Sequence, residues 1–363
     1  MRISLSTVLL TWIVLSLGCG DDNSTTGEVG PSATGGTAGT AGAAGEGAGQ
    51  ASGTGGSGQA GSSQAGGGQG GQGGGTPVSC TASSATLVVV GTKEGGRELV
   101  RISRETGETA VLGVLPAKVQ SFVTDSHVFD KERQRLYLVS EDAGVIIIDM
   151  VTYSTSLIPL KFPDKTWNSP NEFELEKSGF MVGRGRHNDT WSVIRVDASS
   201  GEVTPIIDVD LQGSTINFSR VFDRANHRYH LFTGDSRVIG INTQTIKQDT
   251  GVTLKLPPGW NDPIHPGQDR EGRVVGLSWD GSTEHVVRIS LQDGAIEAMA
   301  DFPKKNWTFS MGAGRAYDPC ANTFSYITGD DEIITISAES GAITNLAPIT
   351  KGYSGFVGLS AVY

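Results

Sequence analysis

The chain has 363 residues, a formal net charge of −11 and 51 glycines. Its acidic excess argues against nucleic acid and against anionic membrane surfaces as binding partners. The length alone suggests two domains, but the composition divides the chain very unequally.

The first 18 residues have the features of an export signal. One positive charge, Arg2, precedes a mostly apolar run from Ile3 to Leu17, which is followed by Gly18 and Cys19. A run of about 15 residues cannot span a hydrocarbon core of roughly 30 Å, which needs about 20. Residues 1–18 are therefore expected to be a cleaved signal peptide rather than a membrane helix.

The end of this segment, Leu15-Ser16-Leu17-Gly18-Cys19, resembles the lipobox of bacterial lipoproteins. The resemblance implies that Cys19 becomes the lipidated N-terminus and that the chain meets the membrane through this lipid. Ser16 stands where Leu is usual, and an ordinary secretory peptide is the alternative. Gly20 rather than Asp follows the cysteine, which by the same resemblance favours the outer membrane of a Gram-negative bacterium, on the periplasmic side or at the cell surface.

Residues 19–78 are predicted to be a tether. After Cys19, this segment consists almost entirely of Gly, Ala, Ser, Thr and Gln. Such a composition cannot bury enough apolar surface to offset the entropy of ordering, so the segment is expected to be disordered. The folded part is then residues 79–363.

One pattern occurs six times in the folded part: an apolar strand, a short polar turn and a second strand. A spacing of 45–48 residues in a β pattern predicts a propeller or a solenoid. Four of the six turns end in Gly, which adopts a positive φ without strain, whereas Tyr153 and Ile246 predict turns of a different shape. The apolar residues five positions before the turn ends are Ile102, Ile148, Val196, Ile241, Ile289 and Ile336.

A second hairpin precedes each of these, so that each unit contains four antiparallel strands, named A to D in chain order. Four strands in about 47 residues make one propeller blade. An acidic residue recurs just before the A–B turn, and we expect the aspartates among them to cap the turn rather than bind metal. These residues are Asp130, Glu176, Asp223, Asp269 and Asp318.

The ends of the folded part indicate how the ring closes. The first unit has no A strand, and one orphan segment, Gly355–Tyr363, remains after the sixth D strand. The C-terminal segment is therefore predicted to complete blade 1 and remove open sheet edges. The arrangement resembles the six-bladed propellers of the NHL, YVTN and TolB-like superfamily over residues 80–363. The expected fold is all-β: a six-bladed β-propeller of four-stranded antiparallel blades.

Two cysteines remain if Cys19 is acylated, and the expected compartment is oxidising. Cys320 belongs to the A–B turn of blade 6, and Cys80 precedes strand B of blade 1 on the same face. Blades 1 and 6 are neighbours across the closure. We therefore predict a disulfide between Cys80 and Cys320.

The D–A segments carry aromatic residues at nearly constant spacing, and the B–C loops on the same face carry acids. Aromatic rings with carboxylates around them suit a sugar, a peptide or a cationic ligand. The alternative is that the rings are wedges between blades. The candidate ligand-binding residues are Trp167, Asn168, Glu172, Trp260, Asn261, His265 and Trp307.

These observations favour a cell-envelope binding platform for an unidentified protein, glycan or small molecule. The tether enters beside strand B of blade 1, so the face with the D–A segments is expected to point away from the membrane. No nucleophile elbow, Walker loop or HExxH motif occurs in the folded part, and no metal or cofactor is expected. The alternative is an enzyme, such as a metal-dependent lactonase or hydrolase or a lyase, with Glu172, Asn217 and His265 as candidates.

Overall fold

The computed structural model describes residues 86–362, apart from 95, 118, 120–121, 123–125, 141–143, 177, 304–313 and 351. The predictions for the signal peptide, the tether, Cys19, Cys80 and Trp307 lie outside the described residues. Strands and turns make up the described part, in which no helix is long and apolar enough to cross a membrane.

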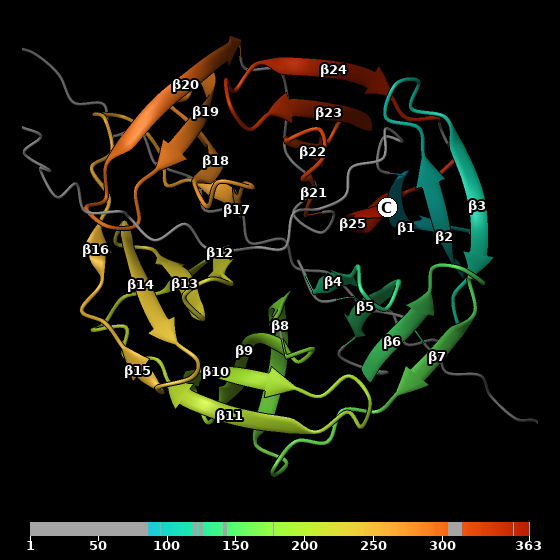
Figure 1. Cartoon of the computed structure of the whole chain (residues 1–363), viewed down its shortest axis with the longest axis horizontal. Coiled ribbons are helices and arrows are strands. Elements are labelled where there is room, and N and C mark those ends of the chain that lie inside the picture. The colour runs from blue at the N-terminus through green and yellow to red at the C-terminus, as the bar shows by residue number, and fades with distance from the viewer. Residues whose placement is uncertain are drawn as a thin grey trace, which may run out of the picture. The chain divides into compact units, whose positions relative to one another are not determined.

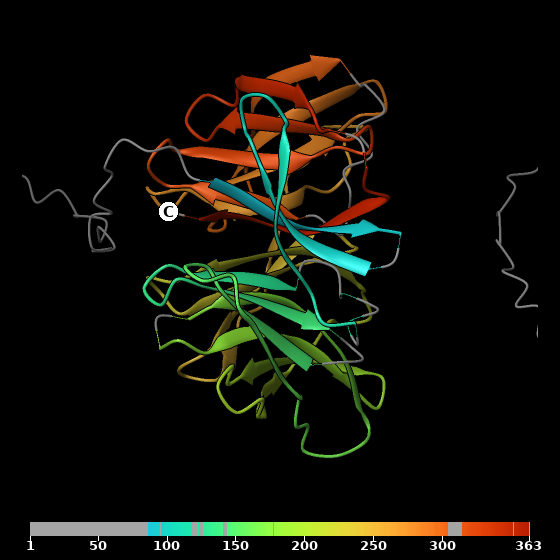
Figure 2. The same cartoon turned by 90° about the vertical axis from the view of Figure 1, so that its right-hand side faces the viewer.

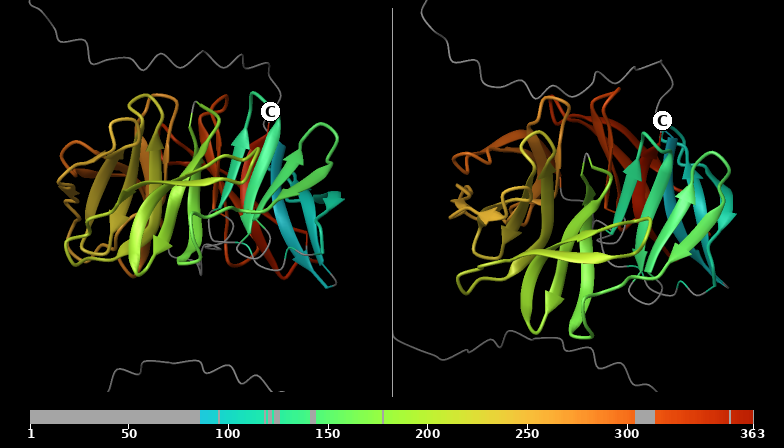
Figure 3. Two further views of the ribbon diagram at one scale, coloured as in Figure 1. Left: turned by 90° about the horizontal axis from the view of Figure 1, so that it is seen from below. Right: turned by 60° about the horizontal axis from the view of Figure 1, so that its bottom comes forward.

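The strands form six antiparallel sheets arranged as blades of a propeller, with strand A of each blade nearest the axis (Figure 1). Five sheets have four strands, and the sheet of blade 4 has five because its outer strand is split. Figure 2 and Figure 3 show the blades from the side. The predicted six-bladed, all-β propeller is confirmed.

Within each blade the strands follow one another along the chain, except that blade 1 takes its strand A from the C-terminus. Blade 1 has β25 (Gly355–Val362), β1 (Thr86–Lys93), β2 (Gly96–Ile102) and β3 (Thr109–Val114); blade 2 has β4 (His127–Asp130), β5 (Arg135–Ser140), β6 (Gly144–Asp149) and β7 (Thr155–Ile158). Blade 3 has β8 (Trp167–Leu175), β9 (Met181–His187), β10 (Thr190–Val196) and β11 (Val203–Asp208); blade 4 has β12 (Ile216–Asp223), β13 (Arg228–Thr233), β14 (Arg237–Asn242), β15 (Lys247–Gln248) and β16 (Val252–Thr253). Blade 5 has β17 (Ile264–Gln268), β18 (Val274–Trp279), β19 (Thr283–Ile289) and β20 (Ile296–Pro303); blade 6 has β21 (Arg315–Asp318), β22 (Thr323–Ile327), β23 (Glu332–Ser337) and β24 (Ile343–Pro348).

The C-terminal strand closes the ring. β25 pairs antiparallel with β1, with Leu87 opposite Ala361, and so supplies strand A of blade 1 (Figure 1). Arg104 of blade 1 also forms a buried ion pair with Asp318 of blade 6, 3.0 Å apart. Closure by the C-terminal strand is confirmed.

Each pair of neighbouring blades encloses an apolar core. Between blades 1 and 2, for example, Val90 and Leu99 pack in the same cluster as Leu138 and Ile146. Both faces of a blade are covered in this way, which explains why the middle strands are nearly continuous apolar runs rather than alternating ones. Residues 144–148 of β6, for instance, are all buried.

The recurring aspartates cap the A–B turns, as predicted. One carboxylate oxygen of each accepts hydrogen bonds from two backbone N–H groups of the turn that follows, at 2.8–3.2 Å. Such side-chain bonds satisfy turn donors that have no partner in the sheet. The four residues are Asp130, Asp223, Asp269 and Asp318.

The sequence predicted that the C–D turns ending in Tyr153 and Ile246 differ in shape from the four that end in Gly. The backbone conformation of these two residues shows that this prediction is wrong. Tyr153 and Ile246 have φ values of 58° and 54°, in the same left-handed region as the four glycines. What differs is the approach of the preceding blade. A Cβ atom at Gly201 would lie 2.1 Å from the carbonyl oxygen of Pro159, and one at Gly294 would lie 1.9 Å from that of Thr253. Both oxygens belong to the preceding blade. Tyr153 and Ile246, by contrast, are exposed.

Cys320 is disulfide-bonded. The other two cysteines, Cys19 and Cys80, lie outside the described residues. The pairing of Cys80 with Cys320 therefore stays a prediction.

Candidate functional site

The strands nearest the axis enclose a cavity of about 400 Å³. Residues of β4, β8, β12, β17, β21 and β25 line it, so that every blade contributes (Figure 1). Turn residues Lys131, Arg224 and Pro319 also line it, which places one side of the cavity at the A–B turns. We call this cavity the channel cavity.

A charged triad lies in the channel cavity. Oε1 of Glu174 in β8 is 3.0 Å from Nη2 of Arg315 in β21 and 3.8 Å from Nε of Arg220 in β12. Two guanidinium groups from different blades thus approach one carboxylate oxygen. The side chains of Arg220, Arg315 and Glu174 are 3%, 12% and 20% exposed, so the acid is the most accessible member.

The two arginines are held by their surroundings. Arg220 donates from Nη2 to the backbone carbonyl of Phe173, 3.0 Å away. Arg315 lies against the backbone of Gly267, where a Cβ atom would be 2.7 Å from its Nε. Because Gly267 has no side chain, the neighbouring strand leaves space for the guanidinium group.

Cationic side chains outnumber acidic ones in the channel cavity. Four lining residues are basic, and the two carboxylates are those of Glu174 and Asp269. Asp269 is bound by Arg273 at 2.7 Å, although burial raises the pKa of its carboxyl group. The cavity therefore attracts anions, in contrast to the acidic chain as a whole. The four basic residues are Lys131, Arg220, Arg224 and Arg315.

The predicted residues of blade 3 do not line the channel cavity. Trp167 is 9% exposed, stacks on His187 with ring centroids 4.9 Å apart and packs in the core between blades 2 and 3. Asn168 is exposed, whereas Glu172 is fully buried and pairs with Arg184 at 2.9 Å. Trp167 thus occupies the position expected of a wedge between blades.

The predicted residues of blade 5 form a separate group. Trp260 is half-buried and stacks on His285, with ring centroids 3.7 Å apart, in a different inter-blade core from Trp167. Asn261 is exposed, and its side-chain amide donates to the backbone carbonyl of Trp279. His265 is buried, with its ring 6.3 Å from that of Tyr326. Ligand binding by these residues stays a prediction.

His285 joins two acids beside Trp260. Its Nδ1 is 2.8 Å from Oδ1 of Asp301, and its Nε2 is 3.5 Å from Oδ2 of Asp280. Aromatic rings and carboxylates thus lie together at this position. Among the described residues, no three or more His, Cys, Asp or Glu side chains are grouped so that they could hold a metal ion.

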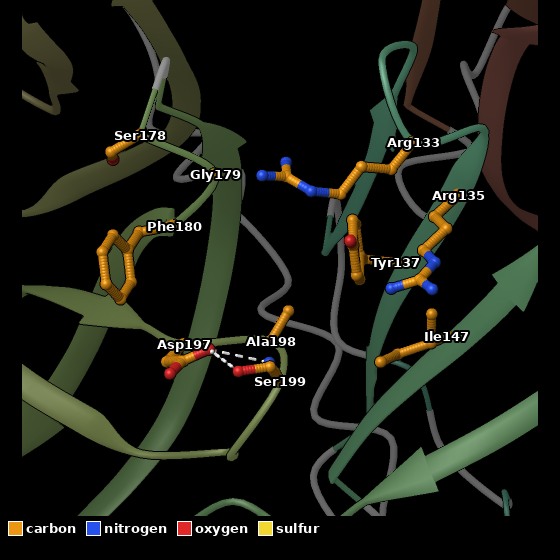
Figure 4. A pocket seen from close by; sticks show the side chains of 10 residues that line it. All are labelled: Arg133, Arg135, Tyr137, Ile147, Ser178, Gly179, Phe180, Asp197, Ala198 and Ser199. Carbon is orange, nitrogen blue, oxygen red and sulfur yellow. Dashed lines mark hydrogen bonds between the residues drawn. The ribbon is translucent and has the colours of Figure 1, made fainter.

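A second cavity, of about 280 Å³, lies between blades 2 and 3. Arg133 extends from blade 2 toward Gly179 of blade 3, and Tyr137 and Asp197 also line the gap (Figure 4). Arg133 is half exposed and already pairs with Asp130 at 2.7 Å. Only two blades build this cavity, so we take the channel cavity as the candidate site.

Sequence reasoning missed the triad, although a signal for two of its members exists. Arg220 and Arg315 each stand three residues before a turn aspartate, Asp223 or Asp318. In the structure these two positions have equivalent registers, opposite Leu231 and Tyr326 in strand B. Counting three residues back from the repeated aspartate would therefore have identified these two arginines as residues at equivalent positions.

No protein-family model matches the sequence, and no curated protein matches it. Solved structures do resemble the fold. TolB from Acinetobacter baumannii has a TM-score of 0.50 and 13% identity, covering 76% of this chain and 66% of TolB, so this chain spans just under two thirds of that protein. An oligogalacturonate lyase in complex with manganese has a TM-score of 0.49 and 11% identity, covering 73% and 74%. The β-propeller domain of Cps50 (Swd1) from Myceliophteria thermophila has a TM-score of 0.45 and 12% identity, covering 75% and 88%. At such identities the likeness concerns the fold alone.

Proposed function

We propose that the chain is a cell-envelope lipoprotein, anchored through Cys19, whose propeller is a binding platform with its ligand site in the channel cavity. The lipobox-like sequence and the Gly-rich tether support the anchoring. The lipid holds the chain at the membrane, and the tether lets the propeller reach a ligand at a distance.

One observation carries the choice of site: all six blades line a single cavity that contains partly buried charged groups. Its volume of about 400 Å³ lies within the range of small-molecule pockets. Charged groups that are shielded from water also interact more strongly with a ligand than exposed groups do.

The site is tested by removing the ion pair without changing the net charge. Wild-type chain and the double variant Glu174→Ala/Arg315→Ala would be compared in a thermal-shift screen of small metabolites. The matched control, Arg186→Ala/Asp189→Ala, removes an ion pair with a distance of 2.8 Å at the surface. The Arg186 side chain is 43% exposed and the Asp189 side chain is 92% exposed. Ligands of the channel cavity should raise the melting temperature of wild type and control but not of the channel variant. Ligands that stabilise all three proteins equally would contradict this location.

The anchoring is tested separately by labelling cells with a fatty-acid probe. Wild type should take up label, and Cys19→Ala should not. Label on the Cys19→Ala protein would contradict lipidation at this residue.

An enzyme is the alternative that the sequence left open. Its candidate residues do not meet in the channel cavity: Glu172 pairs with Arg184, and the Asn217 side chain bonds to Asp262 and to the carbonyl of Thr233. His265 does not line the cavity either. Following any screened ligand by mass spectrometry distinguishes the two functions, since a binding protein returns its ligand unchanged.

A further inference from the structure

We propose that the ligand of the channel cavity is a small anion whose carboxylate or phosphate group replaces Glu174 between Arg315 and Arg220. This inference rests on the proposed location of the site and adds the chemical class of the ligand. It also assigns Glu174 a role, as an internal carboxylate that occupies the anion position when no ligand is bound.

The geometry of the triad carries the first step. Two guanidinium groups lie 3.0 Å and 3.8 Å from the same carboxylate oxygen, Oε1 of Glu174. A guanidinium group presents several N–H donors in a planar fork, which matches both oxygens of a carboxylate or phosphate. Glu174 places a single oxygen between the two guanidinium groups. A ligand anion brings two or three oxygens to the same position and can contact both arginines with different oxygens.

The second step concerns which member of the triad can move. Arg220 is 3% exposed and bonds to the Phe173 carbonyl, and Arg315 lies in the space left by Gly267. Glu174 is the most accessible of the three, with 20% of its side chain exposed. The two cations are therefore preorganised, and the acid is the member that can turn away.

The third step concerns charge at the cavity wall. Lys131 and Arg224 line the cavity at the A–B turns, and Asp269 there is bound by Arg273. Basic lining residues outnumber acidic ones by four to two, and such a surplus in a concave site concentrates anions there. A cationic ligand is disfavoured by the same charges, and a neutral ligand would leave Glu174 in place.

Binding would be measured by calorimetry on the full mature chain with three probes: D-glucuronate, D-glucose and inorganic phosphate. Glucuronate and glucose have similar size and ring shape but differ in charge. We expect glucuronate and phosphate to bind and glucose not to bind. If phosphate binds and glucuronate does not, the natural ligand is a phosphate compound, and the reverse result indicates a carboxylate.

Two variants test the exchange with Glu174. Glu174→Gln removes the competing charge and should tighten anion binding by about tenfold, the value of one charge-assisted hydrogen bond. Arg315→Gln should weaken it by at least about tenfold on the same basis. Arg315→Lys, which keeps the charge but loses the fork, should fall between wild type and Arg315→Gln. The control Arg186→Gln, in β9 and outside the channel cavity, should bind anions as wild type does.

Three results would overturn the inference. Equal binding of glucose and glucuronate, unaffected by Arg315→Gln and Arg315→Lys, would mean a site that does not select anions, while the channel location would survive. No binding of either anion to wild type and to Glu174→Gln would exclude an anion site altogether. An equal loss in Arg186→Gln and Arg315→Gln would show a general charge effect instead of a site.

Discussion

At the scale of single residues, a buried histidine connects the stability of the propeller to pH. His230 in β13 is 5% exposed, and burial lowers the pKa of its imidazole to about 4. The carboxylates of Asp223 and Asp249 act in the opposite direction but do not compensate for burial. The folded chain therefore keeps His230 neutral where an unfolded chain would protonate it.

We expect acid to destabilise the chain through His230 between pH 6.5 and pH 4. In this window the unfolded state binds a proton that the folded state does not, so the free energy of unfolding falls as the pH falls, by at most about 3 kcal/mol. Urea denaturation at pH 7, 5.5 and 4 measures this slope, which His230→Asn should reduce. Asp235 and Asp280, with pKa values of about 2, lose their contribution only below their ordinary pKa of 3.8, in a separate window. A variant with the wild-type slope between pH 7 and 4 would contradict the prediction.

Ile246 is a strained residue in an exposed turn. It is β-branched, has a φ of 54° and is 54% exposed. A left-handed conformation costs such a residue roughly 1–2 kcal/mol, and Gly carries no such penalty. Ile246→Gly should therefore raise the free energy of unfolding by about 1 kcal/mol, measured by chemical denaturation. Val151→Gly, at an exposed turn position without a positive φ, should not stabilise the chain, and an equal gain in both variants would refute the explanation.

At the scale of elements, the C–D turns show what a sequence pattern can predict. The recurrence of Gly correctly indicated a positive φ at four turns, but the expectation for Tyr153 and Ile246 was wrong. The sequence pattern shows which residue occupies a turn, but it does not show how closely the preceding blade approaches that turn. Where the preceding blade comes close, as at Gly201, only Gly fits; where it does not, a side chain can accept the strain.

Gly294→Ala should therefore lower the free energy of unfolding by more than the strain of its backbone conformation alone. Its φ is 74°, and a Cβ atom would lie 1.9 Å from the carbonyl oxygen of Thr253. The strain and the forced shift of backbone together should lower the free energy of unfolding by about 2–4 kcal/mol. Gly259 has a φ of 83° but no heavy atom within 4 Å of the Cβ position, so Gly259→Ala should cost only about 1–2 kcal/mol. Similar losses in the two variants would show that the contact with the neighbouring blade is unimportant.

The candidate site was harder to predict than the turns because strand A is irregular. In β12 and β21, the residue three before the turn aspartate lines the channel cavity. In β8, by contrast, Glu174 lies only two residues before Glu176 and lines the same cavity, so the spacing found in β12 and β21 does not carry over. β8 has two register shifts against β9, both on the N-terminal side of Glu174. The positions of such shifts are set by packing between blades, which the sequence does not display. The aromatic residues were visible in the sequence, but Trp167 is used for packing.

At the scale of the whole molecule, the sequence predicted the number of blades and the closure. Both depend on features that extend along the chain: a period of 45–48 residues, and a missing first strand matched by an extra last one. Blade 1 obtains its innermost strand only if the two ends of the folded part meet, so the count and the closure support each other. Local irregularities shift single residues but do not change the number or order of the strands.

Removal of Gly355–Tyr363 should therefore open the ring. The deletion exposes the edge of β1 and removes Phe356 and Leu359, which are 4% and 0% exposed in the core between blades 1 and 6. An open edge next to exposed apolar surface favours aggregation, so we expect oligomers in light scattering and a large drop in melting temperature. Two point variants distinguish the contribution of the buried side chains from that of the strand pairing. Leu359→Ala should lower the free energy of unfolding by about 2–5 kcal/mol. Gly355→Ala should change it little, because no heavy atom lies within 4 Å of the Cβ position. A truncated chain that stays monomeric and melts at the wild-type temperature would mean that the pairing of β25 with β1 does not hold the ring together.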